Sequence, residues 1–279
     1  MRTSQKRTPG EHVPPLLFTA WVVVSALLVL FPVYLLFMVS VAPGSAIFGE
    51  RPALWVTEPT LRFWQRVIER GDLAAPVAKS LTVATAATLA AIALAAPAAY
   101  VLARLPARVR YPLVVGLLVT RMFPEFVVGV SVATRFARLG LVDDYLGLIL
   151  AYLIPSLPFV VWILVGTFEA LPRDLEQAAA VDGASRLQTL ARIIVPAAAP
   201  GIAVAALFVW LYSWNEFLYA RLLTTSQNTL PLQVFQAVDR GAKQQMAAVA
   251  AVLVLPILPV VYVLQRHLRS GALAGAIKA

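Results

Sequence analysis

Two groups of polar side chains lie inside long apolar segments of the sequence. The first pairs Arg121 with Glu125, four residues apart and therefore on one face of a continuous helix. The second combines aromatic, amide and carboxylate side chains: Trp210, Tyr212, Trp214, Asn215 and Glu216. Aromatic faces beside a few hydrogen-bonding groups suit a carbohydrate, which offers apolar ring faces and many hydroxyls. The predicted lining of a solute pathway comprises Arg121, Glu125, Trp214, Asn215 and Glu216.

Each group also has a purely structural alternative. Arg121 and Glu125 can form an ion pair within one helix, because a lone arginine at the centre of a bilayer costs about 2.5–3.5 kcal/mol and needs a partner. The aromatic residues can be anchors at a membrane interface, where tryptophan and tyrosine are enriched. The residues alone leave both alternatives open.

Catalytic chemistry has no candidate residues in this chain. There is no cysteine, and the two histidines, His12 and His267, lie in the terminal tails. Thiol catalysis, thiolate metal sites and histidine-based sites are therefore not expected. The chain also has no Gly-x-x-x-x-Gly-Lys-Ser/Thr phosphate loop, so it cannot hydrolyse ATP through one. We expect a protein that is not an enzyme and has no catalytic residue, metal or cofactor of its own.

The composition is that of a membrane protein. Of the 279 residues, 60% are hydrophobic and 13% are charged, with a mean hydropathy of +0.80. Soluble domains have roughly 25% charged residues. A formal net charge of +9 is explained by arginine-rich loops at a membrane surface, and no nucleic-acid partner is expected.

Six apolar segments reach the length of about 20 residues that a helix needs to cross a bilayer. They cover residues 16–42, 76–103, 112–136, 147–168, 197–220 and 246–265. The second is rich in alanine and threonine, which suits a helix packed closely against other helices. The fourth and sixth carry paired prolines that predict kinks: Pro155 with Pro158, and Pro256 with Pro259. The predicted fold is an all-α polytopic membrane protein with six transmembrane helices.

Lysine and arginine counts orient these segments. Twelve lie on the side of the two termini and nine on the other side, which favours both termini in the cytoplasm. The chain then consists of a tail (1–15), a six-span domain (16–266) and a second tail (267–279). The long external loop, 43–75, contains apolar residues at helical spacing that predict a helix along the membrane surface, in contact with lipid: Leu61, Trp64, Val67 and Ile68.

The cytoplasmic loop 169–198 carries signals for two short helices. Pro172 predicts a helix start, followed by the acidic first turn of Asp174 and Glu176. Gly183 predicts the end of this helix. The capping-box pair Ser185 and Gln188 then predicts a second helix start. Leu187, Leu190 and Ile194 predict one apolar face of the second helix. From these residues, an ordered connector and a docking element for a partner are equally favoured.

The same loop resembles the EAA loop shared by inner-membrane permeases of binding-protein-dependent ABC importers. Gly183 fixes the register, and four further positions match that pattern: Ala178, Ala179, Ile193 and Pro196. Gln177 stands where the family has glutamate, and Val195 where it has leucine. The stretches RMFP and SWNEFLYA and the ending LRSGALAGAIKA are similar to the maltose-type G subunits of the carbohydrate branch. Lys79 departs from the asparagine of that branch.

The resemblance implies a type I ABC importer permease in the bacterial inner membrane. It implies a second homologous permease, two ATPase subunits that bind ATP and magnesium, and an extracytoplasmic solute-binding protein. The EAA loop would be the coupling helix that contacts an ATPase. The residues implied for coupling are Glu176, Gln177, Ala178, Ala179, Asp182, Gly183, Ala184, Ile193 and Pro196. The implied solute is a di- or oligosaccharide or related sugar.

Two other functions were weighed against this one. A proton-coupled secondary transporter would place acidic residues at mid-membrane, as Glu125 and Glu216 could be, but it would also have internal repeats, and none is visible. An ABC importer for a non-sugar solute, such as a polyol or a glycerol phosphate derivative, shares every feature of the EAA loop. The sequence does not separate that alternative from a sugar importer.

Overall fold

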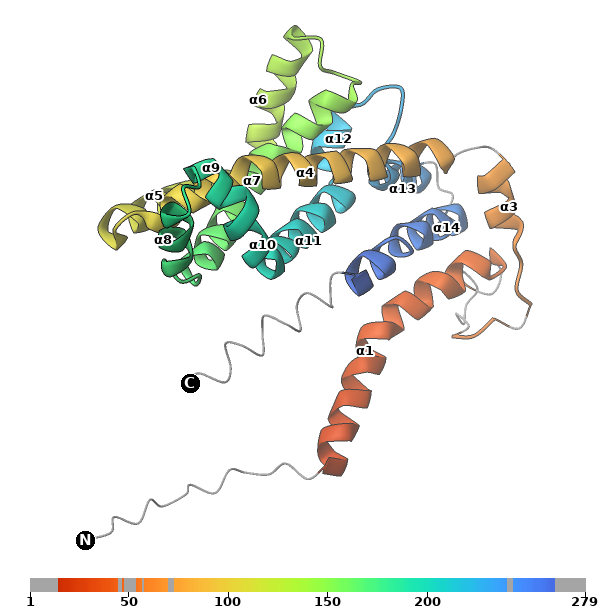
Figure 1. Cartoon of the computed structure of the whole chain (residues 1–279). Coiled ribbons are helices and arrows are strands. Elements are labelled where there is room, and N and C mark those ends of the chain that lie inside the picture. The colour runs from red at the N-terminus through yellow and green to blue at the C-terminus, as the bar shows by residue number, and fades with distance from the viewer. Residues whose placement is uncertain are drawn as a thin grey trace.

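The computed structural model describes residues 15–44, 47, 54–56, 58–69, 73–239 and 243–263. All regular secondary structure in these ranges is helical, which confirms the predicted all-α class (Figure 1). The predicted tails 1–15 and 267–279 lie almost entirely outside the described residues.

Four helices are long and apolar enough to cross a membrane on their own. They are α1 (Pro15–Val41), α4 (Ala74–Arg104), α7 (Tyr145–Glu169) and the segment Gln244–Val263, which begins with α14 (Lys243–Val254). Each agrees with a predicted segment to within a few residues. α7 continues through its two prolines, whereas the last segment has a turn at Leu255 and Pro256 before it resumes.

The third predicted segment, 112–136, is not one helix. α5 (Ala107–Val119) and the short η1 (Thr120–Met122) are followed by α6 (Glu125–Arg138), and the two halves meet at an angle of 85°. The break falls at Phe123, which is extended as the residue before Pro124. A residue before proline is pushed out of the helical conformation, and Pro124 has no amide hydrogen for the helix ladder. Together, the two halves are long enough for one bent span.

The fifth predicted segment, 197–220, is interrupted as well. α11 (Ala199–Asn215) turns by 81° from the helical stretch Arg186–Ala197 that precedes it. It ends before Glu216, and the short α12 (Leu218–Leu223) follows. The carboxyl group of Glu216 accepts the backbone amides of Tyr219 at 2.8 Å and Ala220 at 3.1 Å. It therefore caps the start of α12.

α4 lies at the centre of the helix packing, against α7 and α11 (Figure 1). Its buried face is a stripe of small side chains: Ala84, Ala87, Ala91, Ala95, Ala96, Ala99 and Ala103. Small side chains let two helix backbones approach closely, which gains dispersion contacts where lipid removes the hydrophobic drive to associate. This packing is the one expected from the alanine-rich sequence.

α3 (Arg62–Glu69) and α13 (Leu230–Asp239) are short helices beside the long ones. α3 packs against α1 and α14, and α13 packs against α4 and α14. Val67 of α3 is buried, and the indole Nε1 of Trp64 donates to Ser40 Oγ at 3.2 Å. Ile68 is exposed. The predicted apolar face of this helix is thus divided between protein contacts and the surface.

Candidate functional site

The loop between α7 and α11 folds into consecutive short helices: α8 (Asp174–Val181), α9 (Arg186–Thr189), η2 (Leu190–Ile194) and α10 (Val195–Ala197). The predicted capping box is present: the amide of Gln188 donates to Ser185 Oγ at 3.3 Å, and the amide of Ser185 donates to Gln188 Oε1 at 2.8 Å. Gly183 has a φ of +78°, in the left-handed region that favours glycine. α8 begins at Asp174 rather than Pro172, because the carbonyl of Arg173 is the first acceptor of its ladder.

The turn between α8 and α9 presents apolar side chains outward. Val181 is 88% exposed and Leu187 is 73% exposed. Leu190 and Ile194 are buried whereas Leu187 is not, so the three residues predicted to form one apolar face are not buried together. The remaining residues implied for coupling divide by exposure. Gln177, Ala178, Asp182, Gly183 and Pro196 are exposed, Ala184 and Ile193 are half-buried, and Ala179 is buried.

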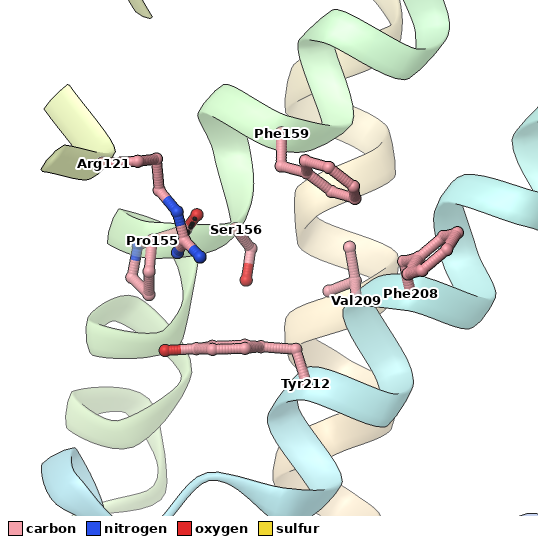
Figure 2. Close-up of a pocket in the computed structure, with 7 residues that line it drawn as sticks. All are labelled: Arg121, Pro155, Ser156, Phe159, Phe208, Val209 and Tyr212. Carbon is pink, nitrogen blue, oxygen red and sulfur yellow. Dashed lines mark hydrogen bonds between the residues drawn. The ribbon is translucent and has the colours of Figure 1, made fainter. Parts of the chain in front are cut away.

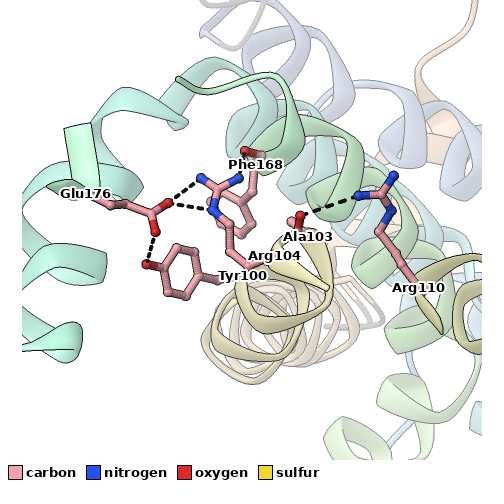
Figure 3. A network of polar contacts seen from close by, with 6 residues as sticks. All are labelled: Tyr100, Ala103, Arg104, Arg110, Phe168 and Glu176. Carbon is pink, nitrogen blue, oxygen red and sulfur yellow. Dashed lines mark hydrogen bonds and ion pairs between the residues drawn. The ribbon is translucent and has the colours of Figure 1, made fainter. Parts of the chain in front are cut away.

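Glu176 points away from that outward surface, toward the end of α4 (Figure 3). Its carboxylate accepts the hydroxyl of Tyr100 at 2.9 Å and Nε of Arg104 at 2.5 Å. The same arginine donates from Nη1 to the carbonyl of Phe168, near the end of α7, at 3.0 Å. A second ion pair, Arg110 to Glu169 at 2.5 Å, lies nearby between α5 and α7. The EAA-like loop is therefore joined to the helix ends above it by charged hydrogen bonds.

The other charged pair, Arg121 and Glu125, does not share a helix face. Arg121 belongs to η1 and Glu125 to the first turn of α6, on opposite sides of the break at Pro124. The prediction of one face and of a possible intrahelical ion pair is therefore wrong. Tyr212 of α11 connects them instead: its hydroxyl donates to Glu125 Oε1, and the guanidinium of Arg121 lies 5.7 Å from its ring centroid.

A cavity lies beside this group (Figure 2). It has a volume of about 160 Å³ and is lined by Arg121, Pro155, Ser156, Phe159, Phe208, Val209 and Tyr212. Arg121 Nη1 donates to the carbonyl of Pro155 at 2.7 Å. A second cavity of about 280 Å³ shares Arg121 and Pro155 and also contacts Glu125. Pro155 lies near the middle of α7, so both cavities lie at mid-span, where transporters bind their solutes.

Apart from Tyr212, the second predicted group is not part of either cavity. Trp214 is buried, stacks on Trp210 with ring centroids 5.2 Å apart, and donates from Nε1 to the carbonyl of Leu253 at 3.0 Å. Asn215 donates to the carbonyl of Leu211 one turn earlier, at 2.8 Å. Glu216 caps α12. Of this group only Tyr212 lines the cavity, and it was not among the residues predicted to line the pathway.

Five further residues that line the first cavity were also missed: Pro155, Ser156, Phe159, Phe208 and Val209. Pro155 and Pro158 gave the available signal, because each proline leaves the α7 ladder one amide donor short and so marks an irregular position in a membrane helix. The aromatic residues at 159 and 208 had no polar neighbour in sequence to distinguish them from lipid-facing side chains.

At the end of α4 distant from α8, polar contacts gather around the segment 224–230. Lys79 Nζ donates to the carbonyl of Gln227 at 2.6 Å, and Ser80 Oγ accepts the amide of Leu230 at 2.8 Å. Asp143, between α6 and α7, accepts amide and hydroxyl hydrogens from Thr225 and Ser226. Burial opposes its charge, but the hydrogen bonds from Ser226 and Thr225 outweigh burial and hold the pKa of Asp143 well below its usual range.

The chain matches known proteins over most of its length. The trehalose transport permease SugB of Mycobacterium tuberculosis is 34% identical, over 93% of this chain and 97% of that protein. The trehalose/maltose permease MalG of Thermococcus litoralis is 30% identical, over 96% and 98%. The diacetylchitobiose permease DasC of Streptomyces coelicolor is 30% identical, over 89% and 91%.

Structural comparison shows the same fold. A crystal structure of a bacterial ABC transporter involved in the import of the acidic polysaccharide alginate superposes with a TM-score of 0.72 at 21% identity, covering 94% of this chain and 99% of that chain. This likeness confirms the fold of a type I importer permease. The family described as binding-protein-dependent transport system inner membrane component matches residues 91–272. The chain therefore belongs to this family of multi-pass inner-membrane permeases of ABC importers, together with its sugar-permease relatives.

Proposed function

We propose that this chain is one of two permease subunits of an ATP-driven importer for a di- or oligosaccharide. A second homologous permease would complete the pathway, two separate ATPase subunits would bind ATP and magnesium, and an extracytoplasmic protein would deliver the solute. The relatives' names support this proposal, since they concern trehalose, maltose and diacetylchitobiose. One related structure contains a periplasmic protein bound to an alginate pentasaccharide.

The α8–α9 turn is the proposed contact with an ATPase. The observation that carries this proposal is the exposure of Val181 and Leu187 on either side of Gly183. Two large apolar side chains lie at the tip of a loop outside the spans. Their exposure to water is unfavourable, and burial against a partner would stabilise them. With this turn in the cytoplasm, successive crossings by the predicted spans would put the first residue of α1 on the same side, as the charge count predicts.

The mid-span cavities are the proposed section of the solute pathway in this subunit. Arg121 and Glu125 offer charged hydrogen-bonding groups, and the ring of Tyr212 lies between them. Trp214 and Glu216 make internal contacts, so we assign them supporting roles; Asn215 is exposed and remains a pathway candidate. Apolar rings with a few convergent polar groups are the usual lining of a small-molecule site.

Co-purification of the whole assembly tests the docking proposal. The chain, tagged at its C-terminus, is expressed with the genes encoded beside it, and the ATPase retained after detergent extraction is quantified. Val181→Asp should remove most of the ATPase, because a charge enters an apolar contact. Leu139→Asp is the matched control, since Leu139 is also exposed but lies in the loop between α6 and α7. Equal retention by both variants would exclude the α8–α9 turn as the docking surface.

A further inference from the structure

We propose that Glu176 is a positioning residue that attaches the α8–α9 loop to α4, and that α4 carries the loop's movement to the segment 224–230. The inference rests on the proposed ATPase contact and adds a route by which that contact reaches the far side of the molecule. It also gives Glu176 an internal role in place of a contact with the ATPase.

The first part of the argument is the attachment at the near end of α4 (Figure 3). Glu176 accepts hydrogens from Arg104 and Tyr100, both on α4 and one turn apart. The side chains of Arg104 and Glu176 are 17% and 23% exposed, so water screens their attraction only in part. Among the described residues, the carboxylate of Glu176 is held by α4 alone. A movement of α8 must therefore move the end of α4 or break charge-assisted hydrogen bonds, which are among the strongest in proteins.

The second part is the attachment at the far end of α4. Lys79 and Ser80 bind the backbone at Gln227 and Leu230. The Lys79 side chain is almost fully buried, and its ammonium group lies 5.4 Å from the ring centroid of Tyr145. Because both bonds are to backbone atoms, they fix the position of the chain there whatever side chains it carries. This contact also gives Lys79 a structural role.

The third part is the rigidity of α4 between the two attachments. Lys79 and Arg104 are 25 residues apart on one continuous helix, which is about 38 Å at 1.5 Å per residue. The alanine stripe between them is buried against α7 and α11. Pro97 lies within this stretch, but the helix continues through it. A helix packed along one face transmits displacement along its axis better than a loop does, because its hydrogen bonds and packing resist local bending.

Matched variants in the assembled complex test the inference. Glu176→Gln and Arg104→Gln should retain the ATPase on co-purification, because the outward surface of the loop is unchanged. The stimulation of ATP hydrolysis by the solute-loaded binding protein should fall by roughly fivefold or more, within the range of allosteric coupling. Asp174→Asn and Arg108→Gln should have no effect, since Asp174 is exposed on α8, beside Glu176, and Arg108 is exposed on α5, the helix that follows α4. The double exchange Arg104→Glu with Glu176→Arg should restore part of the stimulation.

The chain contains no cysteine, so a thiol introduced at one position can report movement there through its rate of labelling. Gln227→Cys places a single thiol at the far attachment, where the side chain is exposed and the bond to Lys79 uses only the backbone. Its rate of maleimide labelling should change on addition of ATP and vanadate, and this change should be lost in combination with Glu176→Gln.

Three results overturn the inference. One is loss of the ATPase in Glu176→Gln together with normal stimulation in Arg104→Gln, which would make Glu176 a direct ATPase contact. Another is normal stimulation of ATP hydrolysis in both variants. The third is a change in labelling rate at position 227 that is the same with and without Glu176→Gln. If the unmodified chain retains no ATPase at all, the proposed function itself fails and the inference with it. That outcome is distinct from the other three.

Discussion

The molecule contains two arginine–glutamate pairs. The pair that is distant in sequence is in direct contact in the structure, and the pair that is close in sequence is not. Arg104 and Glu176 are 72 residues apart and form a direct ion pair at 2.5 Å. Arg121 and Glu125 are four residues apart, yet a helix break separates them and Tyr212 connects them. The first pair fixes one element to another. The residues of the second pair line the two mid-span cavities. Proximity in sequence therefore indicates an ion pair only where the helix is continuous.

The largest effect is expected from breaking the first pair. Arg104→Gln removes the ion pair to Glu176 and weakens the bond to Phe168, at a cost of about 2 kcal/mol in unfolding free energy, as is typical for hydrogen bonds to charged groups. Equilibrium unfolding of the purified chain in mixed detergent measures this loss. The exposed Arg108 is the control: Arg108→Gln should change stability by less than about 0.5 kcal/mol. Equal losses in both variants would contradict the difference in burial on which the comparison depends.

A smaller effect is expected at the second pair. Tyr212→Phe removes the hydroxyl donor to Glu125 but keeps the ring beside Arg121, so the loss should be about 1 kcal/mol. In that background, Arg121→Gln and Glu125→Gln should be additive within about 0.5 kcal/mol, because no direct bond joins the two residues. The same unfolding measurement applies, with the exposed Tyr262→Phe as the control. Strong coupling between Arg121 and Glu125 would instead indicate that the two residues form a direct ion pair.

Asp143 sharpens the comparison, because its charge is stabilised by amides and hydroxyls rather than by arginine. Asp143→Asn should cost roughly 0.5–1 kcal/mol at neutral pH. The pKa of Asp143 is lowered in the folded chain, so its contribution is present above the ordinary aspartate pKa of about 3.9 and is lost as pH falls through the folded pKa. The difference between wild type and variant should therefore shrink in strong acid. Asp144→Asn, which removes the neighbouring exposed carboxylate, is the matched control for the loss of one negative charge.

The smallest effect is expected at Gln177, which neighbours Glu176 but faces outward. Gln177→Ala should lower binding-protein-stimulated ATP hydrolysis by less than about twofold, below the usual range of coupling. Gly183→Ala should reduce it more, because a φ of +78° costs a residue with a Cβ about 1–2 kcal/mol. A larger loss for Gln177→Ala than for Gly183→Ala would show that the amide, rather than the shape of the turn, directs docking.

Local signals predicted local structure well. The capping box of Ser185 and Gln188 and the turn at Gly183 are confirmed, because each depends on residues within four positions of one another. The alanine stripe of α4 likewise predicted close helix packing. The break at Pro124 had a signal, since proline constrains the residue before it, but the apolar composition on both sides concealed it.

Contacts between distant residues could not be predicted in the same way. The direction of Glu176 depends on Tyr100 and Arg104, which lie more than 70 residues earlier. Trp214 and Glu216 carried the residue types of a binding site, yet their partners are the carbonyl of Leu253 and the amides of α12. Residue type indicates which bonds a side chain can make, and only the fold determines which of them it does make.

The cap on α12 determines which charge lies at the start of that helix. A helix start buried in a membrane protein ordinarily attracts negatively charged groups through its free amides. Here Glu216 already occupies two of those amides with an acid of its own. The chain therefore supplies its own acidic group at this helix start, and the amides of Tyr219 and Ala220 are already used by it.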